Sequence, residues 1–431
     1  MAKDVINIGV IGFGNVGSGA VQTLQENAHA IEMKVGTKLV VKKIADLDWD
    51  RPREITLSPN QRTTDAKAVL DDPEIDIVVE AIGGVKPAKD FILTALRNGK
   101  HVVTPNKELI AKHGHEILHE ADSRHLDCYF EGAVGGGIPI IRPLKQCLAG
   151  NRIERILGIV NGTTNYILTR MTSEGKEFAD VLAEAKAKGY AEPDPTDDIE
   201  GNDAAYKICI LASIGYNTSV PLDKVYREGI TRIAQRDLQY AAQLGYVVKL
   251  LAIAADTPQG LELRVHPAFV PVSHPLASVN DVFNAIFVRG SSVGEVMFYG
   301  RGAGSRPTGS AVVGDLIEIA RNIKVNGTGR VSCTCFEDKQ IKPMEEVLTK
   351  YYLRMEVRDR PGVLARIATI FGEEQVSVAS VVQKSSRGDV AEIVWITHQT
   401  VEKQVRRSLE RIERLDELKQ ICNWIRVEDE Q

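Results

Sequence analysis

The first third of the chain alternates short apolar runs with stretches of amphipathic helical pattern. A run of four to eight apolar residues bounded by turn residues is typical of a buried strand, and alternation with helices favours a parallel, doubly wound α/β sheet. The runs predict strands at 5–11, 39–45, 75–81, 101–104 and 127–130, and a helix after the first run extends to about residue 27.

Between residues 151 and 300 the pattern changes to longer strands mixed with helices, which predicts an α+β domain. A helix through about residue 323 follows it, and its apolar face should pack back on the first domain. The predicted strands are 152–160, 247–254, 261–270, 285–288 and 295–299, and the helix face is Val312, Val313, Leu316, Ile317 and Ala320.

Residues 324–350 lose clear periodicity and are predicted to be a linker. After them the order strand, helix, strand, strand, helix, strand predicts a ferredoxin-like sandwich. The strands are expected at 351–357, 376–383, 390–398 and 421–427. The first helix is expected to end at residue 371, and the second is expected at 401–415. The predicted domains are therefore 1–130 with 304–323 packed against it, 131–323, and 351–431.

A glycine-rich turn follows the first predicted strand and precedes the first helix. In this context the first glycine makes the turn, the second lets a pyrophosphate approach the backbone, and the third lets helix pack on strand. The alternative is a tight turn without a ligand. The turn reads Gly12, Phe13, Gly14, Asn15, Val16 and Gly17.

The acid expected about 20 residues after such a turn comes late here, as Asp46 or Asp48, and Arg51 and Arg53 follow it. An acid binds the ribose 2′-hydroxyl of NAD, whereas an arginine accepts the 2′-phosphate of NADP. Both residue types are present, so the sequence leaves the choice between NADP and NAD open.

The segment 189–207, GYAEPDPTDDIEGNDAAYK, carries the densest polar chemistry in the chain. Its prolines interrupt any helix, and Asn202 can cap a new one on which Asp203 and Lys207 share a face. One interpretation is an exposed ion pair, worth about 0.3–0.5 kcal/mol. A calcium loop is another, although the spacing lacks the central glycine and closing glutamate of an EF-hand. A third is a site in which acids hold a substrate ammonium group and a lysine supplies a proton.

Thr104-Pro-Asn-Lys107 lies where a predicted strand ends and a helix begins. Asn106 can cap that helix, which places Lys107 in its first turn against the helix dipole. Ligands bind at the carboxyl ends of parallel strands, so the position of Lys107 indicates a functional role. The alternative is a solvated surface lysine. A glycine-rich turn, Glu131 to Ile138, follows the fifth predicted strand. It is either a hinge between domains or a ligand site formed by main-chain carbonyl oxygens.

Composition narrows the possible functions. With 43% apolar and 26% charged residues, the chain has the composition of an ordinary globular protein. Its net charge of −5 over 431 residues gives no sign of a nucleic-acid or membrane partner. No signal-peptide pattern or membrane-length apolar run occurs, so a cytoplasmic location is expected. The cysteines at 128, 147, 209, 333, 335 and 422 are predicted to be reduced thiols, mostly filling the core.

The run G-Y-x-E-P-D-P-x-D-D-x-x-G-x-D-x-x-x-K at 189–207 resembles the signature of homoserine dehydrogenases. The T-x-N-K segment at 104–107 resembles the same family, and the D-x-P-G-V-L turn at 359–364 resembles ACT domains, which are amino-acid-sensing modules. The three-part order matches the long form of the family. The fold that this resemblance implies is a Rossmann-type domain, an α+β substrate and dimerisation domain, and a C-terminal ACT domain.

The resemblance also implies roles for individual residues. Lys207 and Lys107 would be catalytic, and which of them transfers the proton directly stays open. Substrate-binding residues would be Glu192, Asp203, Asp198 and Tyr190. Cofactor-binding residues would be Gly12 to Gly17, Arg51, Thr104, Lys107, Gly189 and Gly304. A monovalent cation, typically Na⁺, would bind Glu131, Val134, Gly136 and Ile138, chiefly through main-chain oxygens.

The implied activity is the NADP- or NAD-dependent reduction of L-aspartate 4-semialdehyde to L-homoserine, in threonine, methionine and isoleucine biosynthesis. A homodimer or homotetramer inhibited by L-threonine is expected. One alternative is another ACT-bearing dehydrogenase, such as one acting on phosphoglycerate, but the sequence has no clear His/Glu catalytic pair. A second is a catalytically silent sensor of dinucleotide and amino acid.

Overall fold

The computed structural model describes residues 3–53, 55–331 and 333–428. Residues 1–2 of the predicted first domain and residues 429–431 of the predicted last domain lie outside the described residues. The chain forms two compact units, which cut it differently from the predicted domains. The first contains residues 1–160, 203–225 and 283–339, and the second contains residues 161–202, 226–282 and 340–431.

The first unit contains the predicted parallel sheet, with strand order β3-β2-β1-β4-β5-β6 and parallel pairing throughout. All five predicted strands are confirmed. The two-residue β3 was not predicted, because it pairs only with Ile44 and Ala45 and is too short to show a period. The elements are β1 (Val5–Ile11), α1 (Asn15–Glu26), α2 (Ala28–Val35), β2 (Lys38–Ala45), β3 (Arg62–Thr63), α3 (Lys67–Leu70), β4 (Ile77–Glu80), α4 (Ala88–Arg97), β5 (His101–Val103), α5 (Lys107–Ser123) and β6 (Cys128–Tyr129).

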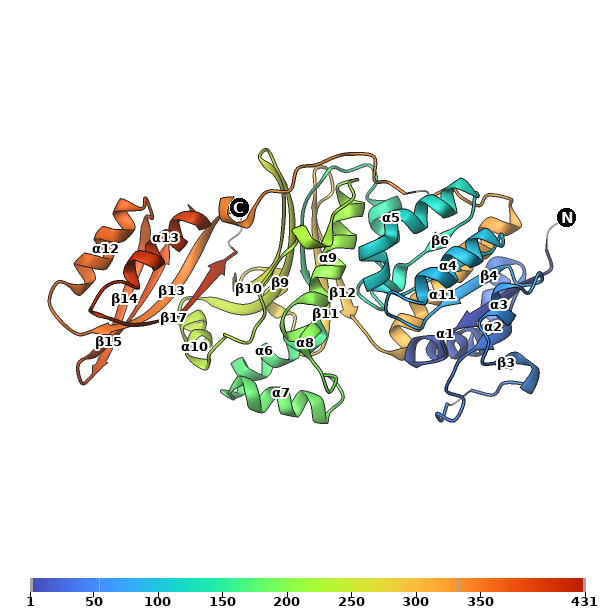
Figure 1. Ribbon diagram of the computed structural model, residues 1–431, viewed down its shortest axis with the longest axis horizontal. Helices are drawn as coiled ribbons and strands as arrows, with labels where there is room; N and C mark the ends of the chain where they lie inside the picture. The colour runs from blue at the N-terminus through green and yellow to red at the C-terminus, as the bar shows by residue number, and fades with distance from the viewer. Residues whose placement is uncertain (1–2, 54, 332, 429–431) are drawn as a thin grey trace. The chain divides into compact units, whose positions relative to one another are not determined.

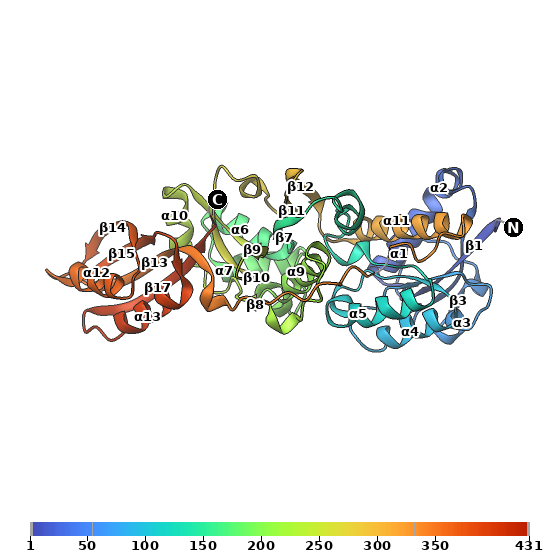
Figure 2. The same cartoon turned by 90° about the horizontal axis from the view of Figure 1, so that it is seen from above.

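Helices cover both faces of this sheet, as Figures 1 and 2 show. One apolar core joins α1, α2 and the later helix α11 (Ser305–Lys324) to one face, and a second joins α3, α4 and α5 to the other. The prediction that α11 packs back on the nucleotide domain is therefore confirmed. The order of the strands is that of a dinucleotide-binding fold.

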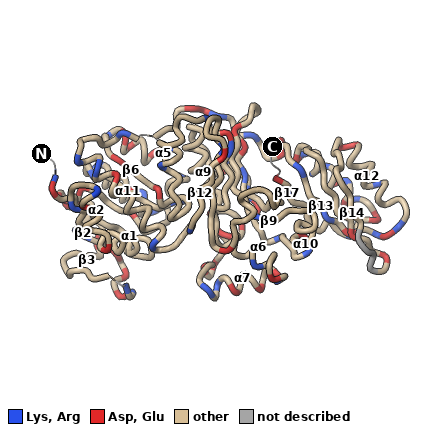
Figure 3. Tube along the Cα trace, turned by 180° about the vertical axis from the view of Figure 1, so that it is seen from behind, with Lys and Arg blue, Asp and Glu red and all other residues tan. Residues whose placement is uncertain are grey.

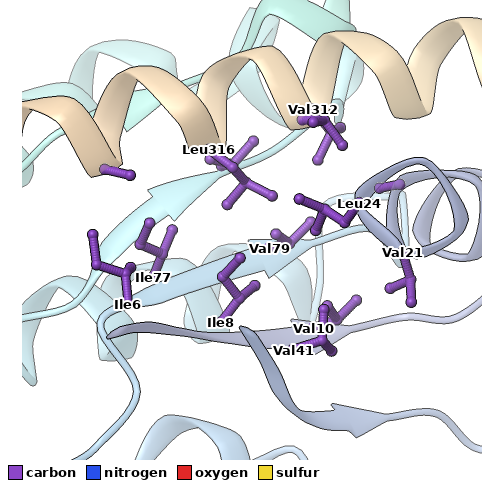
Figure 4. Packing of buried hydrophobic residues seen from close by; sticks show 14 of the residues in the cluster. Ile6, Ile8, Val10, Val21, Leu24, Val41, Ile77, Val79, Val312 and Leu316 are labelled. Atoms are coloured by element: carbon purple, nitrogen blue, oxygen red, sulfur yellow. The ribbon is translucent and has the colours of Figure 1, made fainter. Parts of the chain in front are cut away.

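Helix α11 closes the first core through Val312 and Leu316, which face Leu24 and Val79 in Figure 4. The predicted helix face needs one correction: Ile319 is fully buried, whereas Ile317 is only partly buried. A residue three positions after Leu316 continues the buried stripe, and a residue one position after it turns away.

Two glycines let α11 approach α1 closely. A Cβ at Gly309 would lie 2.5 Å from the Gly19 carbonyl carbon. These glycines therefore set the helix spacing by letting backbone meet backbone.

The first unit also holds an antiparallel set of three strands and one further helix. Strand β11 lies between β7 and β12, with Ala285 opposite both Ile159 and Tyr299. The elements are β7 (Ile153–Ile159), β11 (Phe283–Gly290), β12 (Gly294–Arg301) and α9 (Asn202–Gly215), which belongs to this unit from Asp203 onward.

The second unit combines the rest of the α+β region with the C-terminal module. Its first part is a long hairpin of β9 and β10 with four helices and a short strand, β8, which pairs with β10. The elements are α6 (Gly162–Glu174), α7 (Phe178–Ala187), α8 (Thr196–Ile199), β8 (Tyr226–Arg227), α10 (Gln235–Gln243), β9 (Tyr246–Thr257) and β10 (Gly260–Pro271).

The C-terminal module has the predicted βαββαβ order, with one added two-residue strand, β16. Its sheet pairs β14 with β15, β15 with β13, and β13 with β17, and β17 also pairs with β10 through Ala268 and Phe269. The elements are β13 (Leu348–Arg358), α12 (Val363–Glu373), β14 (Val378–Arg387), β15 (Val390–Thr397), β16 (Thr400–Val401), α13 (Glu402–Ile412) and β17 (Leu418–Val427).

Charged residues of both signs are interspersed along the chain, as Figure 3 shows. Within the described residues, no helix has both the length and the apolar character needed to cross a membrane.

The prediction for the cysteines is partly wrong. All six are free thiols, but only Cys128 and Cys209 are buried, Cys147 is exposed, and the remaining three are half-buried. Most of the cysteines are therefore not core filler.

Candidate active site

The glycine-rich turn has the geometry expected of a dinucleotide site. Gly12 has a φ of +97°, and a Cβ there would lie 2.6 Å from the Ala81 carbonyl group, so the turn rests against the end of β4. A Cβ on Gly17 would lie 2.1 Å from the Gly12 oxygen, which explains the third glycine. A Cβ on Gly14 would meet open space, and no side chain caps α1 there. The backbone N–H groups at the N-terminus of α1 can therefore donate hydrogen bonds to a phosphate.

A cavity of about 750 Å³ lies beside this turn and includes Gly12, Gly14, Asp46, Arg51 and Arg53 in its lining. Gly14 and the acid-arginine segment thus face one space. A cofactor that lies along the carboxyl ends of β1, β2 and β4 would fill it.

The two arginines of this cavity have different environments. Arg53 is nearly buried, donates from Nε to the Phe13 carbonyl oxygen at 2.8 Å, and stacks on the rings of Phe13 and Trp49. Arg51 is exposed and donates to the Asn15 side chain at 2.7 Å. Arg53 therefore holds the turn, while Arg51 can reach a ligand.

Four other predicted cofactor residues, Phe13, Asn15, Val16 and Gly304, lie in or beside the same turn. The Phe13 N–H donates to the Asp46 carboxylate, Val16 packs partly buried against the core, and Asn15 accepts at its carbonyl from the Ser305 hydroxyl at 2.6 Å. Gly304 precedes Ser305 as the N-cap of α11, with a φ of +122°. The start of α11 is thus joined directly to the start of α1.

Glu80 is a functional candidate that the sequence reasoning missed. This fully buried carboxylate at the end of β4 accepts from the Thr104 hydroxyl at 2.6 Å and from the Ile82 N–H at 2.8 Å. It also lies 3.4 Å from the Asn106 amide, while the Asn106 oxygen caps α5 through the Leu109 N–H. An acid at the end of an apolar strand run was the signal available in the sequence.

Asp203 joins the two predicted catalytic lysines. The Lys207 ammonium group lies 2.6 Å from Asp203 Oδ2 and donates to the Val160 carbonyl oxygen, also at 2.6 Å. Lys107, the first residue of α5, forms an ion pair with Asp203 Oδ1. The interpretation of Asp203 and Lys207 as an exposed pair is wrong, because these residues are only 3% and 6% exposed.

The charge state of Asp203 follows from its surroundings. Burial raises the pKa of its carboxyl, but the positive charges of Lys207 and Lys107 outweigh this effect and hold the pKa below its usual value. Asp203 is therefore a carboxylate between two ammonium groups, an arrangement that fixes the lysine nearer the protein interior.

The acid-rich segment ahead of Asp203 belongs to the second unit and is tied to the start of α6. Asn161 caps α6 and donates to Asp198 at 2.6 Å, and the Thr163 hydroxyl donates to the Tyr190 carbonyl oxygen at 2.7 Å. Glu192 lies exposed between these two ties. The segment is thus held at both ends with a free carboxylate in its middle.

Two further predictions for this segment can be compared with the structure. Gly189 has a φ of +71°, a conformation that favours glycine. Asn202 is the first residue of α9 rather than its cap, because its side chain bonds to Asp197 and Arg227 instead of the helix amides. The described residues contain no group of three or more acid, histidine or cysteine side chains able to hold a metal ion, so the calcium-loop interpretation has no support.

The glycine-rich turn after β6 has a different kind of polarity. The Glu131 carboxylate accepts from the backbone N–H groups of Ile140 and Ile141 at 2.6 and 2.7 Å, and the Glu131 N–H donates to buried Asp315 at 2.8 Å. Among the described residues, no backbone N–H donates to the carbonyl oxygens of Val134, Gly136 or Ile138. The turn therefore combines carbonyl oxygens that no described backbone N–H engages with a buried carboxylate, which suits a small hard cation.

Comparison with known proteins agrees with this geometry. Family models match residues 139–317 (homoserine dehydrogenase), 12–131 (homoserine dehydrogenase, NAD binding domain) and 351–417 (ACT domain). A homoserine dehydrogenase of Synechocystis sp. is 46% identical over 431 residues, which cover 98% of this chain and 99% of that protein. The chain belongs to the homoserine dehydrogenase family.

Solved homoserine dehydrogenases have the same fold. The crystal structure of the Thiobacillus denitrificans enzyme is 43% identical, covers 99% of this chain and 98% of its own, and superimposes with a TM-score of 0.94. A hyperthermophilic archaeal homoserine dehydrogenase in complex with NADPH is 30% identical and has a TM-score of 0.60, over 73% of this chain and 97% of its own. As a member of this family, the chain is an NAD(P)-dependent oxidoreductase that acts on a CH–OH group.

The buried position of Asp203 generates a stability prediction. Asp203→Asn removes the charge that compensates Lys207, so we expect a loss of about 3–5 kcal/mol in the free energy of unfolding at pH 7, measured by urea denaturation. Because the folded-state pKa of Asp203 is depressed, its contribution is complete above about pH 4 and is lost as the pH falls further. The difference between variant and wild type should shrink in that acid range.

The matched control is Asp197→Asn, which removes an exposed carboxylate from the same segment. It should change the free energy of unfolding by less than about 1 kcal/mol. Equal effects of the two substitutions would contradict the assignment of Asp203 as the buried counter-charge.

Proposed function

We propose that the chain reduces L-aspartate 4-semialdehyde to L-homoserine with NADPH. Membership of the family supports the reaction class. The observation that carries the proposal is the buried ion pair of Asp203 and Lys207, with Lys107 at its open side. Two ammonium groups at the ends of two helices supply what reduction of a carbonyl requires besides hydride, namely a positioned proton donor.

In this proposal each residue has a defined task. The nicotinamide cofactor supplies hydride to the aldehyde carbon, and the lysine pair supplies the proton to the carbonyl oxygen. Asp203 fixes the orientation of Lys207, and the Val160 carbonyl oxygen holds the same ammonium group from another side. Glu192 and Asp203 bind the amino acid end of the substrate, and Asp198 and Tyr190 shape the same binding segment. Such positioning lowers the entropic part of the barrier.

The cofactor assignment rests on the environment of Arg51. Because Arg53 is engaged with Phe13 and Trp49, the exposed Arg51 is the residue that would bind the 2′-phosphate of NADPH. An archaeal homologue was solved in complex with NADPH, which supports NADPH as a cofactor here. NADH would be bound more weakly by the same glycine turn.

A monovalent cation, Na⁺, fits the turn from Glu131 to Ile138. Its ligands would be the main-chain oxygens of Glu131, Val134, Gly136 and Ile138. The positive φ of Gly136, +53°, supports this assignment, since it gives the turn a curvature that most residues avoid. The ion would stabilise the turn that follows the nucleotide sheet.

The ACT module is proposed to bind L-threonine and lower the activity. The supporting feature is its first turn, in which Gly362 has a φ of +93° and is the N-cap of α12, while the exposed Asp359 lies three residues earlier. We expect a homodimer or homotetramer in which paired modules form the effector site. The proposed location is the cytoplasm.

The first test of this function is Lys207→Met. We expect a loss in kcat on the order of 10²–10⁴, the usual range for a general acid, with cofactor binding retained. Lys34→Met, on the exposed face of α2, serves as the control and should leave kcat unchanged. An unimpaired kcat in Lys207→Met would remove this lysine from the mechanism.

Arg51→Gln tests the cofactor preference. We expect KM for NADPH to rise roughly tenfold or more, the value of one charge-assisted hydrogen bond, with little change in KM for NADH. Arg53→Gln should instead weaken the binding of NADPH and of NADH to the same extent, because Arg53 holds the glycine-rich turn that binds both. Equal effects of Arg51→Gln on NADPH and NADH would show that Arg51 does not bind the 2′-phosphate.

Asp359→Ala tests regulation without removing the module, whose strand β17 pairs with β10 and should not be cut away. We expect wild-type turnover to fall about 5–150-fold with saturating threonine, and Asp359→Ala to keep its turnover but lose this response. Glu410→Ala, an exposed acid on α13, is the control and should respond like wild type. A wild-type enzyme indifferent to millimolar threonine would make the module an assembly device.

A further inference from the structure

Three of the six cysteines lie near one lysine, and a fourth lies near one of these three, although all four are scattered along the sequence. Cys333, Cys128 and Cys335 lie close enough to Lys145 to interact with its charge, and Cys209 lies close enough to influence Cys335. All of these residues belong to the first unit. The cluster lies outside the residues assigned to catalysis, to the cofactor and to the cation.

Lys145, Cys209, Cys333 and Cys335 line a cavity of about 510 Å³, and its wall also includes Ile110 and His115. Helices α5 and α9 form much of this wall, and the connector at 333–335 forms another part of it. Cys333 and Cys335 are only half-buried, so a small molecule can reach them.

The connector is fixed to both helices. The Cys333 N–H donates to the Asp122 carboxylate of α5 at 3.0 Å, and the Glu337 N–H donates to the Asn217 carbonyl oxygen, just after α9, at 2.8 Å. The two thiols are therefore presented by a backbone with defined contacts. Cys-x-Cys spacing keeps one sulfur within reach of the other.

The surroundings of the two thiols shift their pKa values in opposite directions. A hydrogen bond from the Cys335 thiol, a backbone hydrogen bond from Cys335 and the charge of Lys145 lower the pKa of Cys333 to about 6, against the opposing effect of burial. The same hydrogen bond and burial raise the pKa of Cys335. These opposite pKa shifts favour Cys333 as the attacking thiolate and Cys335 as its protonated partner, the usual combination of an attacking and a resolving cysteine.

Metal binding does not explain the cluster. Among the described residues, no group of three or more cysteine, histidine or acid side chains has an arrangement able to hold a metal ion. The positive charge of Lys145 also opposes a cation at this position. A small electrophile is the ligand class that suits a thiolate beside an ammonium group.

We propose that Cys333 and Cys335 form a thiol modification site that reacts with hydroperoxides entering this cavity. The Cys333 thiolate attacks one peroxide oxygen, the O–O bond breaks, and the products are a sulfenic acid and hydroxide, or an alkoxide when the hydroperoxide is organic. The Cys335 thiol then attacks the Cys333 sulfur, which forms the S–S bond and releases water. Both sulfurs are oxidised, the peroxide is reduced, and an external thiol reverses the change.

The disulfide would remove the negative charge beside Lys145 and alter the connector where it contacts α5 and α9. These helices carry Lys107 and Lys207, respectively. The modification site is therefore adjacent to the helices of the active site without including any residue assigned to it.

Competitive alkylation of the full-length protein tests the reactivity. At neutral pH and limiting iodoacetamide, peptide mass spectrometry should show Cys333 labelled roughly tenfold faster than Cys147, although Cys147 is the exposed cysteine. Lys145→Met should slow the labelling of Cys333 severalfold and leave Cys147 unchanged. Faster labelling of Cys147 than of Cys333 in the wild type would overturn the proposal.

Hydrogen peroxide tests the second step. The wild type should form a Cys333–Cys335 disulfide that dithiothreitol reverses, and Cys335→Ser should stop at a sulfenic acid that dimedone traps on Cys333. Cys333→Ser should give neither product at these positions, while Cys422→Ser, at another half-buried cysteine, should behave like wild type. Absence of the disulfide in the wild type, or its formation only between chains, would overturn the proposal.

Discussion

One buried carboxylate in the first unit, that of Asp203, holds two ammonium groups. Asp203 is almost inaccessible to water, and a charge in that position is tolerated only because Lys207 and Lys107 compensate it. Lys107 begins α5, whereas Asp203 and Lys207 lie in the first two turns of α9. Two helices far apart in sequence must therefore start close together, and the rest of the first unit provides that arrangement.

The return of the chain to the nucleotide sheet is the second constraint. Helix α11 contacts α1 through Gly19 and Gly309, and Ser305 bonds to the backbone of Asn15. On the same helix, Asp315 accepts from the Glu131 N–H. Helix α11 thus connects the dinucleotide turn with the cation-binding turn proposed here, and closing the core also sets the position of both.

The sequence predicted the features that local signals determine. The glycine spacing of Gly12 to Gly17, the cap of Asn106 and the βαββαβ order each depend on neighbours within a few residues, and the structure confirms them. The distinct roles of Arg51 and Arg53, the burial of Asp203 and the position of Glu80 depend on residues far away in sequence. Periodicity also failed to separate Ile317 from Ile319, because a shift by half a turn needs the partner helix to decide it.

Direct measurement of the reaction tests the account most simply. The purified full-length chain is mixed with L-aspartate 4-semialdehyde and NADPH, the loss of NADPH absorbance is followed, and the product is identified by chromatography. We expect rapid oxidation of NADPH with an equal amount of L-homoserine formed, and no oxidation when the semialdehyde is omitted. Binding of NADPH without any turnover of the semialdehyde would contradict the account and leave a sensor with a dehydrogenase fold.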